Sequence, residues 1–159
     1  MFLRIETVKE KKLIGKTLRM SFTNNKTVDL WSNFMPRRKE INNVNSEFIS
    51  LEVFDDVSFF STFYPSKEFN KWACIEVKDY NNVPTEMQTL TIPESLYAVF
   101  LHKGPSSDGP LTYNYIFGTW LPDSEYILDN RPHFAVMGAK YKNNDPDSEE
   151  EIWIPVKKK

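Results

Sequence analysis

Two short segments carry side chains that could together hold a small molecule. Trp72, Cys74 and Glu76 alternate along one stretch, and Glu151 and Trp153 alternate along another near the C-terminus. In a β-strand, residues two apart point to the same face of the sheet. Indole rings attract apolar and cationic groups, and a nearby carboxylate supplies a counter-charge. If the two segments converge, they form an aromatic site with acidic character.

Each of these residues also has a plainer interpretation. Trp72 and Trp153 are equally compatible with an ordinary core, and Glu76 and Glu151 with strand ends in water. Cys74 fits a small buried hydrophobe better than a reactive thiol. The burial of Glu76 and its ionic partners would therefore separate a binding site from a solvated surface.

The sequence contains few residues arranged for catalysis or for metal binding. His102 and His133 are the only histidines, and they lack partners at metal-ligand spacing. The segment 144–147 fits a turn better than a calcium loop. There is no Gly-x-Ser-x-Gly elbow, glycine-rich phosphate loop or Cys-x-x-Cys. We expect no metal site, no cofactor and no assigned catalytic residue.

The elements that position these residues follow a strand–helix–strand–strand order that occurs twice. The expected strands of the first half are 11–22, 47–55 and 69–79, with a helix near 26–34. The expected strands of the second half are 95–103, 133–141 and 150–157, with a helix near 111–120. Pro36 falls where the first helix should end.

The two halves also match residue by residue. Phe34-Met35-Pro36 corresponds to Trp120-Leu121-Pro122, and twelve positions after each proline come Phe48 and Phe134. The segment 75–78 likewise matches 154–157. This indicates a duplication within one domain, 1–159, with repeats at about 11–80 and about 89–157. Two such units should pair about a pseudo-two-fold axis and leave a cleft between them.

Composition narrows the class of protein. Twenty basic and 22 acidic residues give a net charge of −2, without the positive field of a dedicated DNA binder. The single cysteine, the lack of a signal peptide and the lack of a long apolar run predict a cytoplasmic protein. The first expected strand begins so early that we expect no helix-turn-helix before it, no direct DNA binding and no membrane partner.

Several stretches resemble the GyrI-like, or SOUL-type, effector-binding domains. Such domains occur as sensor modules of AraC- and MerR-type regulators and as free-standing proteins. The stretches are LWSNFMPRR (30–38), KWACIEV (71–77), LYAVFLHKG (96–104), WLPDSEY (120–126) and EEEIWIPVK (149–157). The resemblance implies an α+β fold of two βαββ repeats with pseudo-two-fold symmetry, in which antiparallel sheets form a groove and the helices lie on the outer face.

The resemblance also implies a type of ligand. Members of this family hold hydrophobic, often cationic, multidrug-like compounds with aromatic rings and a buried carboxylate. Here Arg131-Pro132-His133-Phe134 is followed by Ala135, where the family pattern has glutamate. Ala135 can neither pair with a cation nor take a proton, which weakens the case for cation specificity and for catalysis. Alternation places Ala135 on one strand face with His133 and Met137.

The leading hypothesis is a domain that binds amphipathic or aromatic small molecules, for sensing or sequestration. The expected ligand-binding residues are Trp72, Cys74, Glu76, Tyr97, Ala135, Met137, Glu151 and Trp153. A separate transcription regulator or DNA gyrase is a candidate protein partner.

Two alternatives belong to other classes. A hydrolase of reactive small molecules would need Glu76 or Glu151 as a general acid with a raised pKa. A salt bridge at the surface would remove Glu76 from that role. A protein-interaction module would need an exposed apolar patch, and the loop with Phe59, Phe60, Phe63 and Tyr64 is the first place to look. That loop is more readily interpreted as a cover over the groove or core.

Overall fold

The alternating segments of the sequence form strands, and the computed structural model describes all residues from 1 to 159. The strands are β1 (Phe2–Val8), β2 (Lys11–Met20), β3 (Phe48–Val53), β4 (Phe69–Val77), β5 (Gln88–Ile92), β6 (Ser95–Lys103), β7 (Tyr126–Leu128), β8 (His133–Met137) and β9 (Glu149–Lys158). They pair antiparallel in the order β1-β6-β9-β8-β3-β4-β2-β5, and β7 pairs with β9. The α+β class expected from the sequence is confirmed.

Two helical regions cover one side of this sheet. They consist of α1 (Thr27–Phe34) with a 3₁₀ helix at Met35–Glu40, and α2 (Gly109–Tyr115) with a π-helical turn at Ile116–Trp120 and α3 (Leu121–Asp123). Short 3₁₀ turns lie at Val57–Phe59 and Ser106–Asp108. The Asn25 side chain accepts a hydrogen bond from the Thr27 amide at 2.9 Å, which fixes the start of α1. No helix is long and apolar enough to cross a bilayer.

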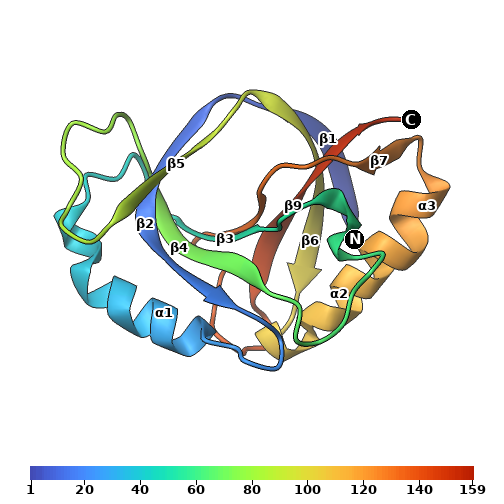
Figure 1. The fold of residues 1–159 in the computed structure, drawn as a ribbon, viewed down its shortest axis with the longest axis horizontal. Coiled ribbons are helices and arrows are strands. Elements are labelled where there is room, and N and C mark those ends of the chain that lie inside the picture. Colours follow the sequence, from blue (N-terminus) through green and yellow to red (C-terminus); the bar gives the residue numbers. More distant parts are fainter.

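The sheet is strongly curved (Figure 1). β1 and β6 stand at one end of the strand order and β2 and β5 at the other, yet only short links join β1 to β2 and β5 to β6. The two ends of the sheet must therefore bend toward each other. We call its concave side the inner face and the side that carries α1 and α2 the outer face. One buried cluster fills the inner face with residues from both halves of the chain. Two further clusters lie on the outer face, one under α1 and one beside α2, and these two have no residue in common.

Some expected boundaries were incomplete. The sequence reading omitted β1, β5 and β7, three strands that extend the sheet or lie beside it. The strand expected at 133–141 ends at Met137, where the chain turns toward β9. The helix expected at 111–120 passes into a π-helical turn after Tyr115.

The repeat match is off by one residue in the middle of the sheet. Phe48 lies opposite Met137 and packs with the cluster under α1, whereas Phe134 lies opposite Leu51 on the inner face. A two-fold axis perpendicular to a sheet keeps each residue on its own face, so Phe48 and Phe134 are not equivalent. Ile75 in β4 and Ile154 in β9 both lie on the outer face, as the match requires.

Candidate functional site

Four of the expected ligand-binding residues lie together on the inner face, where the protein itself fills the space. Trp72 and Trp153 are 7% and 6% exposed, and Cys74 and Tyr97 are fully buried. The Trp153 ring stacks on Phe134 with 5.3 Å between ring centroids. As ligand contacts these four residues stay a prediction, and one that requires a ligand to displace packed aromatic rings. Burial raises the pKa of the Cys74 thiol, which makes it a poor nucleophile.

The two expected carboxylates do not meet between these tryptophans. Glu76 pairs with Lys11 at 3.3 Å, and Glu151 pairs with Arg4 at 3.3 Å. Both carboxylates thus have a basic partner. The condition set for Glu76 as a general acid, burial without a basic partner, is not met.

The remaining expected residues, Ala135 and Met137, lie on the outer face. Ala135 is opposite Ser50 of β3 on one side and Ile152 of β9 on the other. Ser50 is in turn opposite Ala73 of β4. Small side chains therefore cross the middle of the outer face, where Ala73 belongs to the cluster under α1 and Ala135 to the cluster beside α2. We call this strip, floored by Ser50 and Ala135 and flanked by α1 and α2, the furrow.

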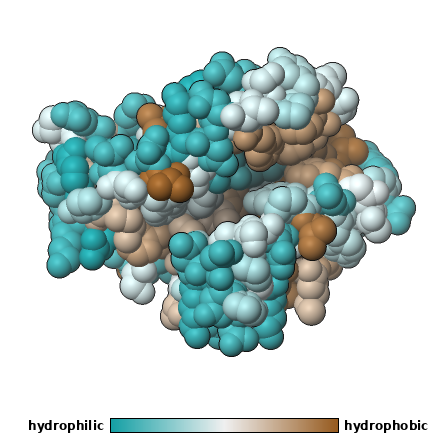
Figure 2. Space-filling view, turned by 90° about the horizontal axis from the view of Figure 1, so that it is seen from below, coloured by the Kyte–Doolittle hydropathy of each residue, from teal (hydrophilic) through white to brown (hydrophobic).

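The molecular surface is hollowed on the side of the two helices. Figure 2 views the molecule from below the position of Figure 1 and so looks onto the side where the two helices lie. Brown, apolar surface lines a depression between lobes of teal, hydrophilic surface. A concave apolar floor with a few polar groups is the usual form of a small-molecule site.

An ion pair stands at one end of the furrow floor. Glu52 of β3 and Lys71 of β4 are ladder neighbours, and the Lys71 Nζ atom lies 3.5 Å from the Glu52 Oε2 atom. Their side chains are 14% and 17% exposed, so both charges are largely withdrawn from water. Burial raises the pKa of the Glu52 carboxyl, and the charge of Lys71 opposes that shift.

A second carboxylate and a phenol share this environment. Glu150 is the second residue of β9 and lies on the same strand face as Ile152. Burial raises the pKa of the Glu150 carboxyl, and Lys71 is one of the charges that oppose the rise. Burial also raises the pKa of Tyr113 in α2 well above its ordinary value, with Glu52 and Glu150 adding to the shift. One lysine therefore lies within electrostatic range of two carboxylates.

Aromatic rings from both halves of the chain enclose the same end. His133, the ladder neighbour of Glu52, has its ring centroid 4.8 Å from that of Phe54 and 5.6 Å from that of Phe60. Phe60 stacks on Phe117 of the π-helical turn at 4.3 Å. Burial, with a smaller effect of Arg131, lowers the pKa of His133 to about 3. The β3–β4 loop thus covers the end of the furrow with an aromatic bridge between the two halves.

The loop considered for protein interaction is divided between two environments. Phe59 is buried and Phe60 packs in the aromatic bridge. Phe63 and Tyr64 are exposed. The interpretation of this loop as a cover is therefore confirmed for its first part.

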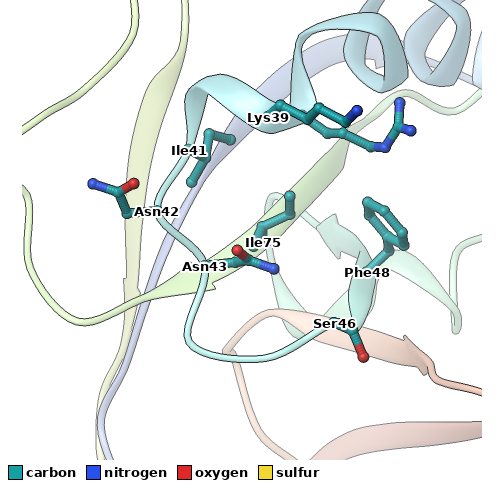
Figure 3. A pocket seen from close by; sticks show the side chains of 8 residues that line it. Lys39, Ile41, Asn42, Asn43, Ser46, Phe48 and Ile75 are labelled. Atoms are coloured by element: carbon teal, nitrogen blue, oxygen red, sulfur yellow. The ribbon is translucent and has the colours of Figure 1, made fainter.

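A surface pocket of about 420 Å³ opens at the Phe48 end of β3 (Figure 3). Its lining residues are Arg38, Lys39, Ile41, Asn42, Asn43, Ser46, Phe48 and Ile75. Two basic and three uncharged polar side chains surround an apolar floor. Phe48 also contacts Trp31 of α1, with 6.3 Å between ring centroids, so this pocket borders the α1 wall.

Arg131 fixes the strand that supplies Ala135 and His133. Its guanidinium donates to the carbonyl oxygens of Leu96 at 2.9 Å and Val156 at 3.0 Å. Tyr97 donates its hydroxyl to the carbonyl of Pro132 at 2.8 Å. These hydrogen bonds tie the segment that leads into β8 to β6 and β9.

Sequence reasoning missed Glu52, Lys71, Glu150 and Tyr113. One signal was present. In the strand expected at 47–55, Ile49, Leu51 and Val53 alternate with Ser50 and Glu52, so a carboxylate stands inside a strand whose other face is apolar. Nothing in the sequence, however, says that Lys71 lies opposite that carboxylate.

Comparison with known proteins identifies the family of this chain. The family model described as a GyrI-like small molecule binding domain matches residues 1–157. The chain belongs to the GyrI-like family. The resemblance found in the sequence is thereby confirmed, together with the general class of small-molecule binding domain. A search of curated proteins gave no match.

Several solved structures share the fold of this GyrI-like domain. The EcmrR C-terminal domain has a TM-score of 0.73 at 16% identity, over 100% of this chain and 99% of that one. SAV2435, solved bound to tetraphenylphosphonium, has a TM-score of 0.66 at 12% identity, over 99% and 94% of the two chains. A hydrolase from Listeria innocua has a TM-score of 0.60 at 9% identity, over 97% and 91%. At these identities the likeness establishes the fold alone.

Proposed function

We propose that this GyrI-like domain binds an amphipathic small molecule in the furrow on its outer face. The observation that carries the proposal is the floor. Ser50 and Ala135 lie opposite each other where the cluster under α1 borders the cluster beside α2, to which Ala135 belongs, and larger side chains here would close the space. Aromatic rings and the Glu52–Lys71 pair border that floor and give a ligand both an apolar and a polar contact.

The inner face supports binding less well. A ligand between Trp72 and Trp153 would have to break ring contacts such as that between Trp153 and Phe134. Displacing such rings gives up packing energy that the ligand must replace. A ligand in the furrow would not have to displace packed rings of this kind.

Filling the furrow tests the proposal directly. Ser50→Phe puts a large ring on the floor, and Thr89→Phe adds the same ring at an exposed position on edge strand β5 as a matched control. At a hundredfold excess over its dissociation constant, a ligand stabilises the native state by about 2.7 kcal/mol. Thermal shift with a panel of aromatic compounds should show this stabilisation in wild type and Thr89→Phe, and its loss in Ser50→Phe. Equal stabilisation of all three proteins would contradict a furrow site.

The biological use of such binding is sensing or sequestration. Two proteins of similar fold support this use: SAV2435 was solved with a bound small molecule, and EcmrR was solved in a complex with DNA. For this domain a separate transcription regulator is the partner class that we propose. Co-purification of the domain with a regulator, in the presence and absence of a furrow ligand, would test that part.

The raised pKa of the Glu150 carboxyl favours one second candidate, a hydrolase. A carboxyl that stays protonated at higher pH can act as a general acid, and Glu150, unlike Glu52 and Glu76, is not paired with a lysine. In that case Glu150→Gln would abolish turnover of a hydrolysable aryl substrate while leaving its binding intact. If the wild-type protein does not turn over the substrate and the variant only loses binding, small-molecule capture remains the function.

A further inference from the structure

Lys71 supplies the Glu52 carboxylate with a positive charge from the protein itself. Its ammonium group lies 3.5 Å from the Glu52 carboxylate, and it is also one of the charges acting on Glu150. The pair is formed by ladder neighbours in adjacent strands, so the chain holds both charges in place before any ligand arrives. A cationic ligand would have to compete with this tethered ammonium ion, whose effective concentration is high.

Apart from Glu150, on which the charge of Lys71 also acts, the rest of the furrow floor offers a cation no partner. Ala135 and Ser50 carry no charge, and His133 stays neutral at neutral pH because burial lowers its pKa to about 3. Arg38 and Lys39, in the pocket at the Phe48 end of β3, add positive charge at that end. An uncharged amphipathic molecule meets none of these costs, since it leaves the Glu52–Lys71 pair intact.

We propose that Lys71 is a built-in counter-ion that makes the furrow select uncharged amphipathic ligands over cationic ones. This inference depends on the furrow being the binding site. It makes Lys71 a specificity-determining residue, and removing its charge should turn the furrow into a cation site, because Glu52 would then lack a partner.

Three probes with a common shape measure the charge preference. Methyltriphenylphosphonium, triphenylmethanol and triphenylacetate each carry three phenyl rings on one central atom, and they are cationic, neutral and anionic. By calorimetry, wild-type protein should bind triphenylmethanol at least tenfold more tightly than methyltriphenylphosphonium. Lys71→Met should tighten the phosphonium by about tenfold or more and change triphenylmethanol by less than about threefold. Lys71→Arg, which keeps the charge, should leave the wild-type order unchanged.

Glu52→Gln gives a second, independent measurement. Lys71→Met leaves a carboxylate without its partner and lowers stability, whereas Glu52→Gln keeps the shape of the side chain and frees the ammonium group instead. This variant should gain triphenylacetate affinity by about tenfold over wild type. An unchanged triphenylacetate affinity would overturn the assignment even if Lys71→Met did not fold.

The outcomes separate the two proposals. If the probes bind wild type and are excluded by Ser50→Phe, but the phosphonium binds as tightly as triphenylmethanol and Lys71→Met does not alter their ratio, the role of Lys71 is wrong and the furrow site stands. If no probe binds wild type, or Ser50→Phe binds all three normally, both the furrow site and the role of Lys71 are overturned.

Discussion

The two faces of the sheet carry similar residue types but use them differently. The inner face holds two tryptophans, a tyrosine and a cysteine in continuous packing, and its carboxylates stand at the ends paired with Lys11 and Arg4. The outer face divides into two clusters, and the strip between them is floored by Ser50 and Ala135 and bordered by the buried Glu52–Lys71 pair. Two tryptophans therefore belong to the core of this domain, and small side chains beside a buried ion pair form the furrow that we propose as its site.

The largest expected effect comes from truncating the inner face. Trp72→Ala removes a large buried ring, so the free energy of unfolding should fall by about 3–5 kcal/mol in urea denaturation. Where the variant remains folded, ligand affinity should change by less than about threefold. A variant with full stability but no binding would reverse the roles assigned to the two faces.

Removing one member of the outer-face ion pair should have the next largest effect. Lys71→Met should lower the free energy of unfolding by about 2 kcal/mol, because Glu52 loses its partner while still slightly open to water. The double variant Glu52→Gln/Lys71→Met should recover most of that loss. If the two single losses simply add in the double variant, the residues are not coupled in the way the geometry indicates.

The aromatic bridge predicts a pH dependence with a definite sign. The pKa of His133 is lowered to about 3 in the folded protein, against about 6.5 for an unperturbed histidine. Between those values the unfolded chain binds a proton that the folded chain rejects, so this histidine makes stability fall as pH falls below about 6.5.

Comparison with His133→Phe isolates this contribution from those of Glu52 and Glu150, whose raised pKa values act in the opposite direction. Denaturation at pH 6 and pH 5 should show wild type losing up to about 1.4 kcal/mol more than the variant. The same pH dependence in both proteins would mean that His133 is protonated in the folded state.

The smallest expected effect concerns the loop over the furrow. Phe60→Ala removes the ring that stacks on Phe117, so stability should fall by about 1 kcal/mol. Ligand dissociation, measured by stopped-flow fluorescence, should become several-fold faster because the furrow is less covered. Phe63→Ala, a change at an exposed position of the same loop, should leave dissociation unchanged.

Alternation along single strands was sufficient to predict which residues share a face. It correctly grouped Trp72 with Cys74 and Glu76, and His133 with Ala135 and Met137. The register between strands was not available from the sequence. Ala135 lies opposite Ile152, so it faces away from Trp153, and the expected ligand-binding set combined residues from both faces.

The strands that were missed show a second limit. β5 is short and mostly exposed, and β7 has three residues, so neither gives a long alternating pattern. The furrow likewise gives no pattern in the sequence. Small residues form its floor, and they form a floor only because α1 and α2 pack on separate clusters on either side of it.

A crystal structure of the domain with triphenylmethanol tests the central claim most directly. The furrow account predicts ligand density between α1 and α2, in contact with Ser50 and Ala135, with the inner-face rings unmoved. Density between Trp72 and Trp153, with Phe134 displaced, would contradict it.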